Sequence, residues 1–173
     1  MPENLHKLFV ISSPSGGGKT SLINKLFEDS RSANFEKSIS DTSRQKREGD
    51  LEGKDYYFLS EKDFKDKIKK EEYVEYAIVF GNFYGTSKEE IKIKYNNSNL
   101  ILELDWQGAY AVKELFDNAK LIFLVPPSLD DLKQRLIKRN LDSSKEIESR
   151  LSEAKKEISK SEMYDYLVLN DDF

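Results

Sequence analysis

Cysteine is absent from the 173-residue sequence, and histidine occurs once, at position 6. Without cysteine the chain can form neither disulfide bonds nor thiolate metal sites. A single histidine cannot by itself build a histidine metal site or a serine triad. His6 precedes the first apolar run, as a solvated terminal residue does.

Long apolar runs are also missing. No stretch approaches the roughly 18 to 20 apolar residues that a membrane-spanning helix needs, and residues 1–4 have no signal-peptide features. We therefore expect a cytoplasmic protein with no membrane partner. The net charge is only −4, so no strong field attracts nucleic acid, and we expect no nucleic-acid partner. With 38% hydrophobic residues, the chain is long enough for one compact domain.

Apolar runs alternate with amphipathic segments along most of the chain. Continuous apolar runs, which are typical of buried parallel strands, occur within residues 8–11, 99–104, 121–125 and 166–169. The pattern predicts helices over about residues 19–27, 108–116, 129–138 and 145–160. This alternation favours right-handed βαβ units around a parallel sheet. Residues 35–91 break the rhythm with short, aromatic-rich strands and one charged helix near 61–70, which indicates a small inserted mixed α/β subdomain.

A phosphate-binding motif follows the first apolar run. Gly18-Lys19-Thr20 ends a glycine-rich turn and opens a helix, which is the context of a P-loop rather than of an ordinary glycine-rich turn. Glycines let N–H groups face phosphate oxygens, and the helix N-terminus adds its positive dipole end. Lys19 can reach the β- and γ-phosphates, and the Thr20 hydroxyl can hold Mg²⁺. Ser13 departs from the general pattern, which has glycine there. The nucleotide-binding residues predicted here are Ser15, Gly16, Gly17, Gly18, Lys19, Thr20 and Ser21.

Further motifs follow in a fixed order. They read SDTSRQKREG (residues 40–49), an aromatic strand (56–58), FGNFYGT (80–86), DWQG (105–108), PPS (126–128) and NDD (170–172). In this order and spacing the sequence resembles the guanylate kinase family from Leu8 to its last residue. Lys46, where the family often has proline, and Glu103, where it often has aspartate, depart from the pattern without removing a charge that the mechanism needs.

The resemblance implies one domain over residues 1–173. Its parts are a P-loop NTPase three-layer α/β core with a parallel sheet (about 5–34, 96–138 and 160–173), an inserted GMP-binding subdomain (about 35–95) and a helical lid (about 139–159). It implies Mg²⁺-dependent phosphorylation of GMP, and of dGMP, by ATP, giving GDP and ADP in purine nucleotide metabolism. A monomer or a homodimer is expected.

The chemistry of GMP explains the acceptor residues that the resemblance names. A planar guanidinium matches two phosphate oxygens at once, and Arg44 and Arg47 are the candidates. Guanine presents the donors N1–H and N2–H₂ beside the acceptor O6. One carboxylate accepts from both donors, and Glu75 resembles the guanine-reading glutamate of the family. The GMP-binding residues implied are Ser40, Arg44, Arg47, Tyr56, Glu75, Tyr84, Thr86 and Asp105.

Phosphoryl transfer needs alignment and charge neutralisation more than covalent help from the protein. Asp105 follows an apolar strand, and we expect it to position Arg47, water or metal rather than to act as a strong base, because a GMP phosphate oxygen is already ionised. By resemblance Asn170 contacts the adenine of ATP, and Arg135 is a further candidate for binding ATP. The catalytic residues implied are Lys19, Arg44, Asp105 and the lid arginines Arg139 and Arg150.

Two other functions fit the same fold. One is a non-catalytic guanylate-kinase-like module that binds phosphopeptides in scaffold proteins, and the other is a P-loop kinase for a different small acceptor. The chain keeps the residues that such modules lose, which favours an enzyme, and Glu75 with its neighbouring hydroxyl positions favours guanine. Relatives usually continue with another helix, so a chain that ended at Phe173 would expose apolar surface beside the final strand.

Overall fold

Five parallel strands form the larger of two sheets in the computed structural model, which describes residues 7–139 and 143–171. They are ordered β2-β7-β1-β8-β9. Their bounds are β1 Leu8–Ser12, β2 Phe35–Lys37, β7 Asn99–Glu103, β8 Lys120–Val125 and β9 Tyr166–Leu169. The apolar runs of β1, β7 and β8 are buried on both faces, which confirms the predicted parallel sheet.

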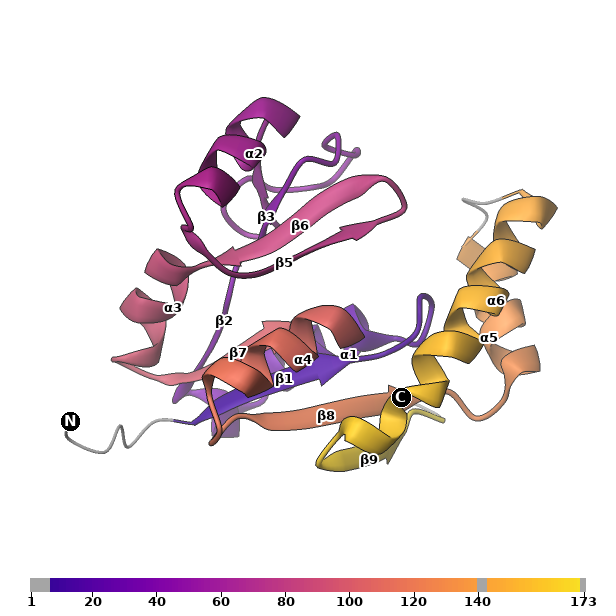
Figure 1. The fold of residues 1–173 in the computed structure, drawn as a ribbon. Coiled ribbons are helices and arrows are strands. Elements are labelled where there is room, and N and C mark those ends of the chain that lie inside the picture. Colours follow the sequence, from indigo (N-terminus) through magenta and orange to yellow (C-terminus); the bar gives the residue numbers. More distant parts are fainter. Residues whose placement is uncertain (1–6, 140–142, 172–173) are drawn as a thin grey trace.

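Helices cover both faces of this sheet (Figure 1). Along β1, successive side chains point to opposite faces, so Val10 and Ile11 belong to different hydrophobic clusters. On the Ile11 face, Ile23 of α1 (Lys19–Glu28) completes the smaller cluster. On the Val10 face, the larger cluster includes Val112 of α4 (Trp106–Leu115) and Ile91 of α3 (Lys88–Tyr95). The result is the three-layer core that the resemblance implies.

A smaller four-stranded sheet, ordered β4-β3-β6-β5, lies over α4 (Figure 1). Its strands are β3 Asp41–Thr42, β4 Tyr57–Phe58, β5 Tyr73–Val79 and β6 Asn82–Ser87, and β5 and β6 form an antiparallel hairpin. Helix α2 (Glu61–Lys69) covers this sheet, and its fully buried Phe64 stacks on Tyr73 with ring centroids 4.5 Å apart.

The insertion begins later than the sequence suggested. Strand β2 belongs to the large sheet, where the ring of Phe35 lies 5.8 Å from that of Phe9. The small sheet therefore starts after Lys37 and not near residue 35. Helix α3 was not predicted, although Ser87 and Glu90 have the spacing of a helix start and the Ser87 hydroxyl accepts from the Glu90 N–H.

Helices α5 (Leu129–Arg139) and α6 (Ser144–Ser159) lie side by side next to the β1–α1 turn (Figure 1). A capping box between Ser143 and Glu146 starts α6. Arg139 ends α5, and its side chain lies outside the described part of the structure. Single 3₁₀ turns occur at Ser30–Ser32 and Ser161–Met163. Within residues 7–139 and 143–171, no helix combines the length and the apolarity that crossing a membrane requires.

Strand β9 forms one edge of the large sheet, and its side chains are exposed. Tyr166, Leu167, Val168 and Leu169 are between 42% and 62% exposed.

Candidate functional site

The turn between β1 and α1 has the backbone of a phosphate-binding loop. Gly16 and Gly18 have φ angles of +86° and +89°, which side-chain-bearing residues rarely adopt. The Gly17 N–H donates to the Pro14 carbonyl at 2.8 Å and tightens the turn. Gly18 is the N-cap residue of α1 and provides no side-chain cap, so the first N–H groups of that helix are open to an anion.

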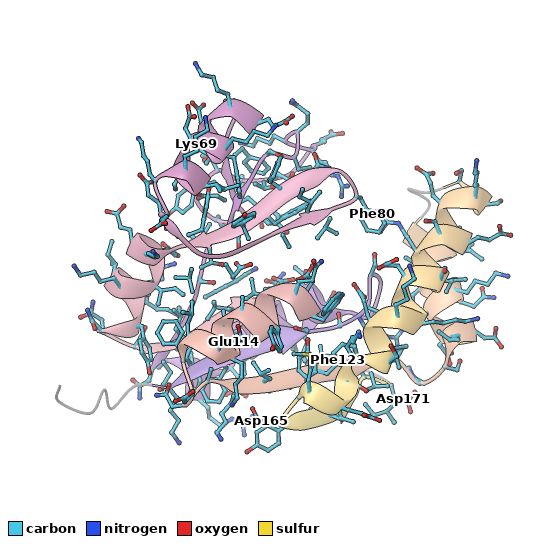
Figure 2. The ribbon with its side chains drawn as sticks, viewed as in Figure 1. Lys69, Phe80, Glu114, Phe123, Asp165 and Asp171 are labelled. Carbon is cyan, nitrogen blue, oxygen red and sulfur yellow. The ribbon has the colours of Figure 1, made fainter. Side chains whose placement is uncertain are left out.

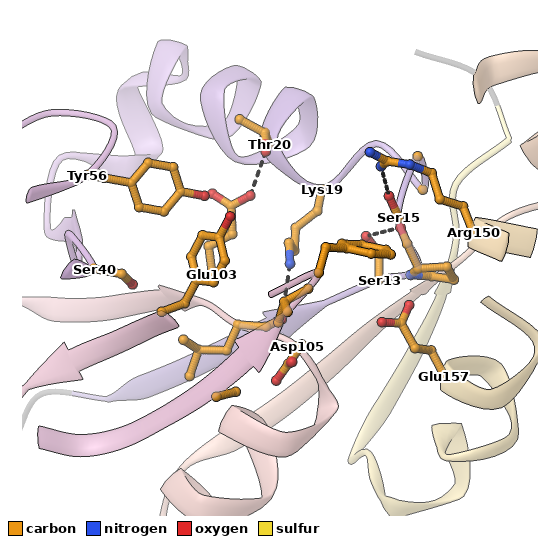
Figure 3. Close-up of a pocket in the computed structure, with 18 of the residues that line it drawn as sticks. Ser13, Ser15, Lys19, Thr20, Ser40, Tyr56, Glu103, Asp105, Arg150 and Glu157 are labelled. Atoms are coloured by element: carbon orange, nitrogen blue, oxygen red, sulfur yellow. Dashed lines mark hydrogen bonds between the residues drawn. The ribbon is translucent and has the colours of Figure 1, made fainter. Parts of the chain in front are cut away.

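The sequence motif places Lys19 and Thr20 at the start of α1, where both contact the end of β7. The Lys19 ammonium donates to the Leu104 carbonyl at 3.1 Å, and the Thr20 hydroxyl donates to Glu103 Oε1 at 2.5 Å (Figure 3). Glu103 Oε2 pairs with Lys37 Nζ at 2.7 Å. Burial acts to raise the pKa of Glu103, but Lys19, Lys37 and the Thr20 hydroxyl outweigh it, so the net pKa is lowered. Thr20 and Glu103 both line a cleft between the large sheet and the small one. This side of the cleft therefore holds an ionised carboxylate beside the threonine hydroxyl.

Asn170 and Arg135 support the phosphate loop from behind. The Asn170 amide donates to the Gly17 carbonyl at 2.7 Å and is 7% exposed. A Cβ on Gly18 would lie 2.4 Å from the same amide, so Gly18 gives Asn170 the room to approach. Arg135 donates to the carbonyls of Asn170 and Asp171 at 2.9 and 3.0 Å. Neither side chain lines the central cleft.

Arg150 reaches the loop from α6. Its guanidinium donates to Ser15 Oγ at 2.7 Å (Figure 3). Glu157, two turns later on the same face of α6, also lines the cleft. Burial raises the pKa of Glu157 to about 7, while Lys19 acts to lower it. The sequence alone does not single out Glu157, because a glutamate in a charged helix is usually solvated.

Glu75 lies at the opposite side of the cleft, on β5. It is 6% exposed, and its Oε1 is buried with no hydrogen-bond partner among the described residues. Burial raises the pKa of Glu75 to about 7; the nearby Thr86 hydroxyl opposes this rise, and the Asp105 charge adds to it. Thr86 pairs with Glu75 in the hairpin register, and its buried Oγ1 likewise has no partner in the described part of the chain. Glu75 Oε1 is thus a buried acceptor that lacks a donor, and Thr86 Oγ1 is a buried hydroxyl oxygen whose group can donate or accept. The two atoms lie side by side, away from water.

Gly108 makes room for the Glu75 carboxylate. A Cβ on Gly108 would lie 2.8 Å from Glu75 Oε2, closer than such atoms approach. Gly108 belongs to the DWQG motif, but its sequence position gives no hint of this contact. Its N–H donates to Asp105 Oδ1 at 2.9 Å, so Asp105 caps α4 at its N-terminus.

Tyrosines and arginines occupy the rim between the two ends. The rings of Tyr56 and Tyr84 meet edge to face at 5.8 Å, and both line the cleft. Burial is the main cause that raises the pKa of Tyr56 to about 12, and the charge of Glu103 adds to it, so the Tyr56 hydroxyl stays protonated. Arg44 pairs with Asp50 at 2.9 Å, whereas Arg47 is exposed and lines the cleft.

These groups surround one cleft of about 290 Å³ between the large sheet and the small one (Figure 3). The structure brings most of the predicted residues together there, and leaves Ser21, Arg44, Thr86, Arg135 and Asn170 outside its lining. The predicted residues that line it are Ser15, Gly16, Gly17, Gly18, Lys19, Thr20, Ser40, Arg47, Tyr56, Glu75, Tyr84, Asp105 and Arg150.

Comparison with known proteins agrees with this geometry. The guanylate kinase family model matches residues 5–173. The chain belongs to the guanylate kinase family. It is 46% identical over 172 residues to a guanylate kinase of Wolbachia sp. subsp. Brugia malayi, covering 98% of this chain and 87% of the relative. A guanylate kinase of Francisella tularensis subsp. tularensis is 44% identical over 169 residues, covering 96% of this chain and 89% of the relative.

A solved structure supports the same assignment. The crystal structure of guanylate kinase from Anaplasma phagocytophilum is 35% identical and superposes with a TM-score of 0.79, covering 98% of this chain and 79% of that one. Membership of the guanylate kinase family confirms the predicted P-loop α/β fold and the prediction that the chain is an enzyme.

Proposed function

We propose that this chain transfers the γ-phosphate of ATP to GMP, and to dGMP, releasing GDP and ADP. The observation that carries this proposal is the buried Glu75 carboxylate, whose Oε1 has no hydrogen-bond partner in the described structure. The N1–H and N2–H₂ groups of guanine supply the two donors that such a carboxylate needs. The Thr86 and Ser40 hydroxyls can donate to O6. Adenine presents an amino group at the six position instead, so it would leave Glu75 facing the wrong edge.

The donor end of the proposed reaction is the phosphate loop. We infer that the β- and γ-phosphates of ATP lie at the Ser15–Ser21 turn and that Lys19 exchanges its bond with the Leu104 carbonyl for a phosphate oxygen. Asn170 and Arg135 are proposed to lie toward the adenine side, because both contact the back of this turn.

The residues at the start of α1 fit Mg²⁺ that arrives with the nucleotide. Thr20 offers a hydroxyl, with the ionised Glu103 within 2.5 Å of it. Among the described residues, no group of three or more acidic or histidine side chains could hold a metal alone, which suits an ion bound mainly by phosphates. When bound, Mg²⁺ neutralises charge on the phosphates.

The acceptor phosphate is proposed to meet the rim of tyrosines and arginines. Arg47, Tyr56 and Tyr84 line the cleft between the guanine and ATP ends. Arg44, held by Asp50 and flanked by the rings of Tyr56 and Phe58, is positioned before the phosphate arrives.

Transfer is proposed to depend on charge neutralisation by arginines from the helical lid. Arg150 already contacts the phosphate loop through Ser15, and Arg139 is the second lid arginine. Asp105, fixed as the cap of α4, is proposed to order the acceptor end without acting as a strong base. We place the reaction in purine nucleotide metabolism in the cytoplasm, carried out by a monomer or a homodimer.

A coupled assay of ADP release tests the proposal, with ATP, Mg²⁺ and either GMP, AMP, CMP or UMP. We expect rapid turnover with GMP alone and its loss in Lys19→Ala, while the exposed-site control Lys133→Ala retains it. No turnover with any acceptor, in a chain that circular dichroism shows to be folded, would refute the kinase and favour the binding module.

A further inference from the structure

Phe80 occupies the turn between β5 and β6 in a conformation that does not suit it. Its φ is +48° and that of Gly81 is +78°, the pattern of a two-residue turn that favours asparagine or aspartate before glycine. A left-handed backbone at a residue with a side chain costs energy. The Phe80 side chain is also 57% exposed, so neither turn preference nor burial accounts for phenylalanine at this position.

The ring of Phe80 faces the lid arginine. Figure 2 shows Phe80 at the end of the β5–β6 hairpin that points toward α6. The Arg150 guanidinium carbon lies 5.1 Å from the ring centroid, within the range of a cation–π contact. The same guanidinium donates to Ser15 Oγ at 2.7 Å. One arginine therefore joins the phosphate loop to the tip of the hairpin.

The hairpin connects this contact to the acceptor end of the cleft. Glu75 and Phe80 are five residues apart on one side of it, and Tyr84 lies on the returning strand opposite Ala77. The ladder runs without interruption from Glu75–Thr86 to Val79–Asn82, so the hairpin is one paired element. A group held at its tip is thus fixed relative to Glu75.

We propose that Phe80 is a positioning residue for phosphoryl transfer: its ring holds the Arg150 guanidinium beside the phosphate loop, so that the hairpin carrying Glu75 also orients the arginine facing the donor phosphates. The inference rests on the proposed function. Phe80 itself lines the cleft, and the role assigned to it here is carried out through Arg150.

The turn itself supplies a sharp test, because asparagine suits its backbone better than phenylalanine does. If Phe80 only shapes the hairpin, Phe80→Asn leaves turnover unchanged and the protein is at least as stable. If Phe80 positions Arg150, Phe80→Asn lowers kcat about two- to fivefold, which is the rate factor that corresponds to losing an exposed cation–π contact. The Tm of the variant is then equal to that of the parent or higher. The affinity for GMP, measured by calorimetry, stays within about twofold of the parent in this case. Phe80→Tyr keeps the ring face and restores kcat.

A double-mutant cycle links the effect to the arginine. In an Arg150→Gln background, Phe80→Asn produces no further loss if it acts through Arg150. An equal loss in both backgrounds, or an unchanged kcat in Phe80→Asn itself, overturns the inference.

A readout without turnover separates this inference from the proposed function. The Arg150 Nε–Hε resonance lies near the Phe80 ring and moves in Phe80→Asn but not in the distant exposed-site variant Lys62→Asn if the contact exists in solution. An unmoved resonance overturns the inference in an active enzyme. An unmutated chain that phosphorylates no GMP refutes the proposed function, whatever this resonance does.

Discussion

Replacing Glu75 by glutamine should affect stability and GMP binding in opposite directions. Glutamine keeps the size of the buried side chain and removes its titration. In the unfolded chain this carboxyl titrates near its ordinary pKa of 4.5, whereas burial raises the pKa to about 7 in the folded protein. The difference corresponds to about 3 kcal/mol of lost stability once the carboxyl is ionised in both states.

The sign of the pH dependence follows from the raised pKa. Below the unfolded pKa both states bind the proton, and Glu75 costs nothing. As pH rises toward 7, the folded state holds the proton more tightly than the unfolded state, so the free energy of unfolding falls. Glu75→Gln has no such dependence and should be more stable than the parent by up to about 3 kcal/mol at pH 8. For a chain of this size that is about 6 to 12 °C in Tm.

Binding should respond the other way. The carboxylate accepts two hydrogen bonds from guanine in the proposed complex, whereas the glutamine amide turns one N–H toward a donor. We expect GMP to bind Glu75→Gln at least about 100-fold more weakly at pH 8. At pH 6 the parent must first release a proton from Glu75, so this ratio should shrink about tenfold. The GMP phosphate titrates near pH 6 with both proteins, and the ratio cancels its effect.

Thermal unfolding from pH 5 to 8 and calorimetric titration of GMP at pH 6, 7 and 8 measure both effects. Glu148→Gln, at an exposed position of α6, is the matched control and should follow the parent throughout. A Tm difference between Glu75→Gln and the parent that is the same at pH 5 and pH 8 would refute the reasoning, since the carboxylate would then not be desolvated. A difference that grows as the pH falls would do so as well.

Three further predictions concern the surroundings of the site. Gly108→Ala should raise KM for GMP about tenfold or more and leave KM for ATP unchanged, because the new Cβ would lie 2.8 Å from Glu75 Oε2. An unchanged KM for GMP would contradict this, as would a protein stabilised by the full helix propensity of alanine over glycine, about 1 kcal/mol. Asn170→Ala removes the 2.7 Å bond to the Gly17 carbonyl and should weaken binding of a non-hydrolysable ATP analogue about fivefold without affecting GMP, as calorimetry can decide. EDTA should abolish turnover, and added Mg²⁺ should restore it. Glu103→Gln should raise the Mg²⁺ concentration for half-maximal rate severalfold, because this carboxylate accepts from the Thr20 hydroxyl. An unshifted Mg²⁺ titration would show that Glu103 does not contribute to Mg²⁺ binding.

The sequence predicted the parts of the fold whose signals are local. Continuous apolar runs located four of the five strands of the large sheet. For β1, β7 and β8 the reason is burial on both faces, which leaves no need for polar alternation. Strand β9 has the same apolar run although its side chains are exposed. The three-residue strand β2 and the charged helix α3 escaped, since their burial depends on contacts with distant elements: Phe35 on Phe9, and Ile91 in the larger core cluster. Helix α3 did carry one local signal, the spacing of Ser87 and Glu90 at its start.

The candidate site divides along the same line. The phosphate loop could be located because strand, glycines and helix adjoin in the chain. Contacts between distant segments could not: nothing near Gly108 indicates that it faces Glu75, and nothing near Phe80 indicates Arg150. Resemblance named several of these residues without the contacts that would explain them.

Three carboxylates around one cleft show how strongly the neighbouring groups determine the pKa of a buried carboxyl. Glu103 faces Lys19 and Lys37, and its pKa falls in spite of burial. No cation among the described residues offsets the burial of Glu75, and its pKa rises to about 7. The pKa of Glu157 also rises to about 7, because Lys19 offsets only part of the effect of burial. A carboxylate whose charge is matched by lysines is complete without a ligand. A desolvated carboxylate without a neighbouring cation obtains its hydrogen bonds only when a ligand brings donors. In this cleft Glu75 lies where the donor edge of a purine can reach it.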